Sequence, residues 1–127
     1  MKYLINAANL HVGGGVQVAV SAISEIASRD DAEASLSFLI SSTVERNLDI
    51  SILASASHLG QETMDVHGFD AGNCLARRRM DSFDRVFTIF GPLYRWSPPF
   101  RSIVGFAQPW IIYPRNECYG RLSRLQR

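Results

Sequence analysis

Apolar residues along this chain alternate between short blocks typical of strands and longer runs with helical spacing. The first block covers residues 3–5 and is followed by a polar, glycine-rich turn. From Val16 to Ala27, apolar residues recur every three or four positions, which predicts a helix with one buried face. Residues 36–40 are again apolar and predict a second strand. These segments form a βαβ unit, whose strands must be parallel because the helix crosses over one face of the sheet.

The following segments repeat strand and helix patterns less regularly. Residues 44–53 predict a helix capped by Thr43, which either continues through residue 53 or gives way to a new element near Ile50. Residues 62–69 alternate between apolar and polar positions and predict a half-buried edge strand. A short helix is predicted over residues 75–83, where three consecutive arginines are typical of a solvated face.

The last third of the chain predicts two more strands and a terminal helix. Residues 85–90 are apolar on both faces, as expected of an interior parallel strand. Residues 103–106 predict a further strand that is interrupted and resumes over residues 110–113. Residues 116–127 have the spacing of an amphipathic helix. Between these strands, the aromatic and proline-rich residues 93–100 either pack a loop onto the core or form a wall that binds a sugar or an apolar ligand.

Together these elements predict an α/β fold of Rossmann-like type, a three-layer sandwich with a mainly parallel sheet. We expect that sheet to include residues 3–5, 36–40, 85–90 and 103–106. The 127 residues, with 46% apolar and 20% charged residues, predict a single domain over 1–127. Because the formal net charge is only +1, the chain lacks the basic surface that a phosphate backbone requires, and we expect no nucleic-acid partner.

Cysteine usage and apolar run lengths indicate the compartment. Cys74 and Cys118 stand alone, without metal-like spacing to any histidine, so we expect no metal site and no disulfide framework. Free thiols are typical of a reducing compartment. The apolar run at the N-terminus is too short for a signal peptide, and no apolar run reaches the length of a membrane span. The sequence therefore predicts a cytoplasmic protein.

The glycine turn carries the clearest candidate chemistry. Gly13, Gly14 and Gly15 follow the first strand and precede the first helix, whose N-terminal N–H groups attract anions. Glycine lets the backbone adopt positive φ and lets an anion approach closely. The spacing matches neither the dinucleotide fingerprint nor the phosphate loop of nucleotide-hydrolysing enzymes. A phosphate-binding turn and a tight turn without a ligand therefore both remain open.

Polar side chains beside this turn are the next candidates. His11 is the best candidate for a catalytic base, although a lone histidine in a turn is also a common hydrogen-bonded loop residue. Asn9 and Gln17 are candidates for binding sugar hydroxyls, or they cap the turn and the helix.

Two further pairs follow later strands or interrupt them, namely Gly91 with Pro92, and Gln108 with Trp110. Ligands of open α/β sheets gather outside the carboxyl ends of the strands, so we expect both pairs to join the glycine turn on one acceptor-binding surface.

Three blocks of the sequence resemble a known family. They are Asn9-Leu10-His11-Val12-Gly13-Gly14-Gly15-Val16-Gln17-Val18, Val86-Phe87-Thr88-Ile89-Phe90-Gly91-Pro92 and Gly105-Phe106-Ala107-Gln108-Pro109-Trp110. These blocks are similar to the N-terminal half of bacterial glycosyltransferases of the group 1, or family 4, type. The similarity extends over nearly the whole chain but is specific only in the three blocks.

The resemblance implies a GT-B architecture, in which two Rossmann-like domains face each other across a cleft. This chain is then the acceptor-side domain of a retaining enzyme that moves a sugar from a nucleotide-sugar donor to a saccharide or lipid-linked acceptor. It implies that Gly13, Gly14 and Gly15 face the donor phosphates, and that no metal or other cofactor is needed. The main donor contacts belong to a C-terminal domain, the partner of this one, and we expect the chain to be a fragment that is inactive alone.

The family's usual role implies cell-envelope polysaccharide biosynthesis, with peripheral contact at the inner face of the membrane in the full-length protein. Two alternatives stay open. One is another nucleotide-binding enzyme of Rossmann type, such as an oxidoreductase, which predicts an acidic residue after the second strand where Ser41 and Ser42 stand. The other is a noncatalytic α/β binding module.

Overall fold

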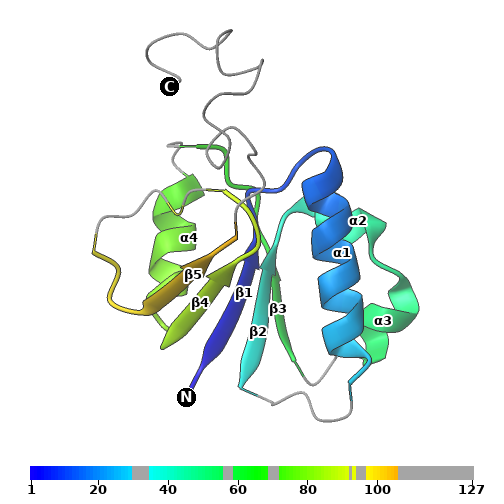
Figure 1. Cartoon of the computed structure of the whole chain (residues 1–127), viewed down its shortest axis with the longest axis horizontal. Helices are drawn as coiled ribbons and strands as arrows, with labels where there is room; N and C mark the ends of the chain where they lie inside the picture. Colours follow the sequence, from blue (N-terminus) through cyan, green and yellow to red (C-terminus); the bar gives the residue numbers. More distant parts are fainter. Residues whose placement is uncertain (30–34, 56–58, 69–71, 92, 94–96, 106–127) are drawn as a thin grey trace, which may run out of the picture.

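The computed structural model describes residues 1–29, 35–55, 59–68, 72–91, 93 and 97–105. These residues form five strands and four helices (Figure 1). In chain order, they are β1 (Tyr3–Ala7), α1 (Gly14–Ala27), β2 (Leu36–Ile40), α2 (Ser42–Asn47), α3 (Ile50–Ser55), β3 (Gly60–Thr63), α4 (Gly72–Met80), β4 (Arg85–Thr88) and β5 (Arg101–Val104).

All five strands are parallel and make one sheet in the order β3-β2-β1-β4-β5. The first strand is central, with Ile5 opposite Phe38 of β2 on one side and opposite Phe87 of β4 on the other. The chain builds outward from β1 through β2 to β3, then returns to the other side of β1 for β4 and β5. This reversal of direction beside the central strand defines a Rossmann-like α/β fold.

Helices cover both faces of the sheet and make three layers. Figure 1 shows α1, α2 and α3 on one side of the sheet and α4 on the other. Successive side chains of a strand point to opposite faces, so each strand feeds two cores. One core joins Ile5 and Phe38 to Ile23 of α1, and the second joins Leu4 and Val86 to other elements. The predicted fold class is therefore confirmed.

The first helix buries the face that its spacing predicts. Val16, Ala19, Ile23 and Ala27 are buried, and Val20 and Ile26 pack against the same core. The segment after β2 forms two short helices because Leu48 has extended backbone angles (φ −79°, ψ 142°). The second of these helices begins after Asp49, whose Oδ1 accepts a hydrogen bond from the Ser51 backbone N–H at 2.8 Å. A new element therefore does begin near Ile50.

Several predicted boundaries are wrong. The edge strand predicted over 62–69 is β3, which covers only Gly60–Thr63. The helix predicted over 75–83 is α4, which begins three residues earlier. The strand predicted over 103–106 is β5, which begins two residues earlier. The first strand continues through Asn6 to Ala7, and β4 ends at Thr88. The strands and helix predicted beyond residue 105 lie outside the described residues.

The predicted burial of β4 is also wrong. This interior strand was expected to be buried on both faces, but its burial alternates, and the Phe87 side chain is 40% exposed. On the neighbouring strand, Ile103 is 65% exposed on the same face. The described residues therefore leave this part of the sheet exposed on the side of α1.

Candidate functional site

The glycine turn lies at the carboxyl end of the central strand, between β1 and α1. Gly13 is the residue before α1 and has a φ of 71°, which favours glycine. A Cβ at Gly15 would lie 3.2 Å from Leu10 Cδ2, so this glycine lets the turn pack closely. A Cβ at Gly14 would meet nothing within 4 Å. Gly13 and Gly15 therefore have structural explanations, whereas Gly14 faces open space.

The N-terminus of α1 lacks a protein cap among the described residues. No side chain caps it, and no acidic residue lies in its first turn. The Val16 N–H donates to the Gly13 carbonyl at 3.2 Å, while the N–H groups of Gly14 and Gly15 find no acceptor among the described residues. Two backbone donors and the positive end of the helix dipole are thus open to an anion at this edge.

Asn9 joins the glycine turn to the end of β4. Its Nδ2 donates to the Phe90 carbonyl at 2.7 Å, and its Oδ1 is buried without a hydrogen-bond partner among the described groups. Gly91 follows with a φ of 96°, and a Cβ there would lie 2.6 Å from Asn9 Nδ2. The turns after β1 and β4 are therefore in direct contact, as the topology predicts for parallel strands.

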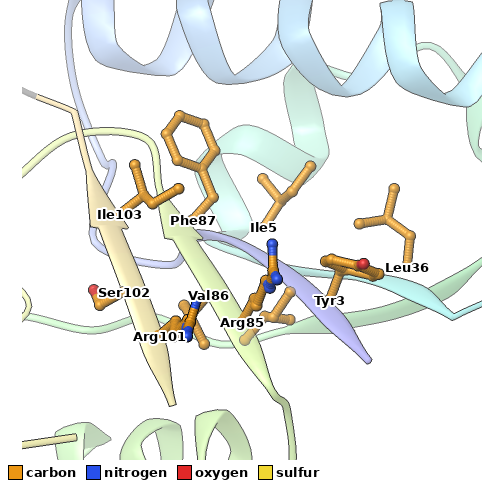
Figure 2. Close-up of a pocket in the computed structure, with 10 residues that line it drawn as sticks. Tyr3, Ile5, Leu36, Arg85, Val86, Phe87, Arg101, Ser102 and Ile103 are labelled. Carbon is orange, nitrogen blue, oxygen red and sulfur yellow. The ribbon is translucent and has the colours of Figure 1, made fainter. Parts of the chain in front are cut away.

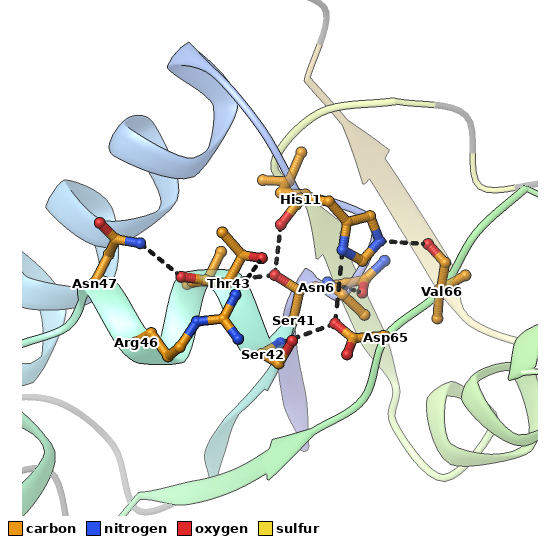
Figure 3. Close-up of polar contacts among 12 residues, drawn as sticks. Asn6, His11, Ser41, Ser42, Thr43, Arg46, Asn47, Asp65 and Val66 are labelled. Carbon is orange, nitrogen blue, oxygen red and sulfur yellow. Dashed lines mark hydrogen bonds and ion pairs between the residues drawn. The ribbon is translucent and has the colours of Figure 1, made fainter.

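His11 joins the same turn to the segment after β3. Figure 3 shows its ring between Asp65 and the Val66 carbonyl. The Nε2 atom lies 2.9 Å from that carbonyl oxygen, and Nδ1 lies 3.6 Å from Asp65 Oδ1. The His67 ring stacks on the His11 ring, with centroids 3.9 Å apart. Two loops at the carboxyl edge, after β1 and after β3, therefore meet around a pair of imidazoles and one carboxylate.

The Asp65 carboxylate is stabilised in its charged form. The Ser42 backbone N–H donates to Asp65 Oδ1 at 2.9 Å, and this bond is the largest cause that lowers the pKa of Asp65 below its ordinary value. The Ser42 hydroxyl and the positive charges of His11 and His67 lower this pKa further. Asp65 is thus an anion at neutral pH and a strong acceptor beside the two rings.

The hydrogen bonds of His11 limit its chemistry. A carbonyl oxygen only accepts, so His11 Nε2 carries the proton that it donates to Val66. The other nitrogen, Nδ1, faces the Asp65 carboxylate at 3.6 Å. Both nitrogens are thus directed at protein groups. This geometry suits a residue that links two loops better than a general base that accepts a proton from a substrate.

The loop that carries His11 is held by the end of β2. Ser41 is fully buried, and its hydroxyl donates to the Leu10 carbonyl and accepts from the Val44 N–H at 3.1 Å (Figure 3). Ser41 therefore caps α2 and fixes the loop after β1 at once. Sequence reasoning assigned this cap to Thr43, which lies inside α2.

A buried polar pair lies directly beneath the turn. Asn6 Nδ2 donates to Thr88 Oγ1 at 3.2 Å, and Asn6 Oδ1 accepts from the Ala8 N–H at 3.2 Å. The pair ties β1 to β4 at the level where both strands end. Sequence reasoning placed Asn6 in the turn, and it missed Asp65 and the roles of Ser41 and Thr88, because these roles depend on contacts between residues far apart in the sequence.

The remaining predicted site residues lie apart from this cluster or outside the described residues. Gln17 is exposed on α1, where it lines a shallow hollow with Val18 and Ser21. Pro92, Gln108 and Trp110 lie outside the described residues, so their expected place on the cleft wall stays a prediction. Of the predicted residues, the structure brings together Asn9, His11, the three glycines and Gly91.

Side chains of the described residues offer no ready metal centre, since no three of their His, Cys, Asp or Glu residues group closely enough to hold an ion. Cys74 is a free, exposed thiol. Over the same residues, no helix has the length and apolar character needed to cross a membrane.

Comparisons with known proteins do not add a family to this geometry. The chain matches no family model, no curated protein and no solved structure.

Proposed function

We propose that this chain is the acceptor-side domain of a retaining glycosyltransferase of GT-B type. One observation carries the proposal: the loops after β1, β3 and β4 meet at the carboxyl edge of a parallel sheet, around an uncapped helix N-terminus. Nucleotide-sugar donors present a diphosphate, and an anion of this kind suits the open N–H groups of Gly14 and Gly15. The three sequence blocks that resemble the family include Gly13–15 and Gly91, which lie at this edge.

In this proposal the domain contributes binding and orientation. The Gly14 and Gly15 N–H groups stabilise the leaving diphosphate without a metal ion. Asn9 and the turn at Gly91 form part of the wall against which a saccharide or lipid-linked acceptor lies, together with Pro92, Gln108 and Trp110. A second domain supplies the nucleotide contacts and closes the cleft, which excludes water and orients both substrates.

The experiment is a transfer assay with UDP-, GDP- and ADP-sugars against a panel of saccharide and lipid-linked acceptors. We expect sugar transfer with retained anomeric configuration when this domain is expressed together with a donor-binding domain, and none from residues 1–127 alone. Transfer by the 127-residue chain alone would contradict the division of labour. Absence of transfer with every donor in the two-domain protein would contradict the proposal itself.

A noncatalytic binding module is the second candidate, and the geometry of His11 favours it. The two ring nitrogens of His11 both face protein groups, so the best sequence candidate for a base is engaged. This candidate predicts that nucleotide sugars or saccharides bind at the carboxyl edge and leave chemically unchanged. Product analysis in the same assay separates the two functions.

A further inference from the structure

A groove of about 640 Å³ lies on the side of the sheet that faces α1, over strands β1, β4 and β5. Figure 2 shows Phe87 and Ile103 projecting from the sheet into this groove. Parallel sheets are normally covered on both faces, so an uncovered part needs an explanation. The groove also lies away from the carboxyl edge, because its charged residues, Arg85 and Arg101, are the first residues of their strands.

Strand register arranges the groove as two rows of side chains. The row at the amino ends of the strands is Leu36, Tyr3, Arg85 and Arg101, and the next row is Phe38, Ile5, Phe87 and Ile103. In the second row, Phe38 and Ile5 are buried, whereas Phe87 and Ile103 are exposed. The groove is therefore an apolar floor with a band of positive charge across one end.

Among the described residues, the two guanidinium groups have no anionic partner. Arg85 lies over the Tyr3 ring, 6.0 Å from its centroid, and neither Arg85 nor Arg101 makes an ion pair with any described residue. Neighbouring strands lie about 4.8 Å apart, so the register places the backbones of these two like-charged residues next to each other. One carboxylate between them would offset the repulsion and accept forked hydrogen bonds from both.

The size and charge of the groove favour a small molecule. Its volume falls within the roughly 300–1,000 Å³ of small-ligand sites, which are likewise mostly apolar with a few polar groups that fix orientation. The chain's own residues 106–127 match the charge poorly, because they carry four arginines and one glutamate. A second copy of the chain would bring the same two arginines to the interface.

We propose that this groove binds an amphiphilic carboxylic acid, with its apolar body over Phe87 and Ile103 and its carboxylate between Arg85 and Arg101. This site is independent of sugar transfer, because it lies at the opposite end of the strands from the glycine turn.

The probe is dodecanoate, titrated into the 127-residue chain below its micelle concentration and followed by calorimetry. We expect saturable binding at one site, with dodecanol and dodecyltrimethylammonium much weaker. Arg85→Gln and Arg101→Gln should each weaken binding roughly tenfold, as expected for loss of a hydrogen bond to a charged group. Ile103→Ser should weaken it about fivefold through lost apolar contact.

Matched controls lie on α4, on the other side of the sheet. Arg78→Gln and Leu75→Ser remove the same kinds of exposed side chain there and should leave the affinity unchanged. A thermal melt of each variant checks that the fold is intact. Three results would overturn the proposal: no binding by the wild type, equal affinity in the arginine variants and their controls, or a dimer that Ile103→Ser dissociates, which would make the groove an interface between copies.

Discussion

Three consecutive glycines occupy three different environments in this turn. Gly13 has positive φ, and Gly15 packs against Leu10, so both are explained by the fold. Gly14 has neither constraint, yet its N–H is one of the two that find no acceptor among the described residues. The phosphate role that we propose for the turn therefore concerns Gly14 most, a distinction that the sequence Gly-Gly-Gly does not reveal.

Substitution of Gly14 by valine should leave stability almost unchanged, within about 0.5 kcal/mol, because a Cβ at this position would meet nothing within 4 Å. Gly91→Val should destabilise the fold by roughly 2–3 kcal/mol, since valine tolerates positive φ poorly and would clash with Asn9. Urea unfolding of both variants measures the difference. In the two-domain protein, Gly14→Val should still depress turnover, and wild-type turnover would contradict the phosphate role.

The cluster around Asp65 should make stability depend on pH. Because folding lowers the pKa of Asp65, its stabilising effect is fully present above the unfolded value of 3.8 and is lost as the pH falls through the lower folded pKa. Asp65→Asn should therefore flatten the acid side of the profile of Tm against pH. Asp49 is the matched control, because Ser51 lowers its pKa without a nearby imidazole.

Asp65→Asn should also differ from Asp49→Asn near neutral pH. Only Asp65 faces the two stacked imidazoles, so only its loss removes the carboxylate beside them. We expect the Asp65 variant to lose more stability than the Asp49 variant at neutral pH. Identical profiles for the two variants would show that the cluster does not act as a unit.

At the scale of elements, patterns predicted the existence of strands better than their limits. The alternation of Met64 and Val66 suggested an edge strand, but these residues cross the carboxyl edge, where their N–H groups donate to Ile40 and Ala8 at 2.8 and 3.0 Å. Extended segments alternate in burial whether or not they belong to a ladder. The polar strand β3 itself, Gly-Gln-Glu-Thr, carries no apolar signal.

Interior strand β4 shows a second limit. Its apolar residues predicted burial on both faces, and burial depends on what the remainder of a protein places over the sheet. Phe87 and Ile103 are apolar at positions that the described residues leave uncovered. The contact of the glycine turn with Gly91 was predictable, because it follows from the arrangement of the parallel strands. The links through Ser41, Asp65 and Val66 were not, because they depend on contacts between residues far apart in the sequence.

Substitution of Ser41 tests how the elements are held together, because this residue joins β2, α2 and the loop after β1. Ser41→Ala removes the α2 cap and leaves the Leu10 carbonyl without its donor, which should cost about 2 kcal/mol. Thr43→Ala, at the cap position that the sequence favoured, should cost much less, because among the described residues Thr43 Oγ1 accepts a hydrogen bond only from the exposed Arg46, at 3.3 Å. Urea unfolding compares them, and equal losses would contradict the assignment of the cap.

At the scale of the molecule, two different surfaces lie at opposite ends of the same strands. The carboxyl edge gathers turns, open N–H groups and the imidazole pair. The amino end of β4 and β5 carries Arg85 and Arg101 above an apolar floor. Separate surfaces of this kind let one domain bind two ligands without competition, so dodecanoate and nucleotide sugars should bind independently.

The most direct test of the proposed function is amide NMR of the 127-residue chain during titration with UDP-, GDP- and ADP-sugars. The account predicts concentration-dependent shifts of the Gly14 and Gly15 amides, at millimolar affinity because the turn alone offers few donor contacts, and loss of these shifts in Gly14→Val. Neutral saccharides should not change the chemical shift of either amide. If every nucleotide sugar leaves the Gly14 and Gly15 amides unshifted, or shifts them equally in Gly14→Val, the glycine turn does not bind donor phosphates.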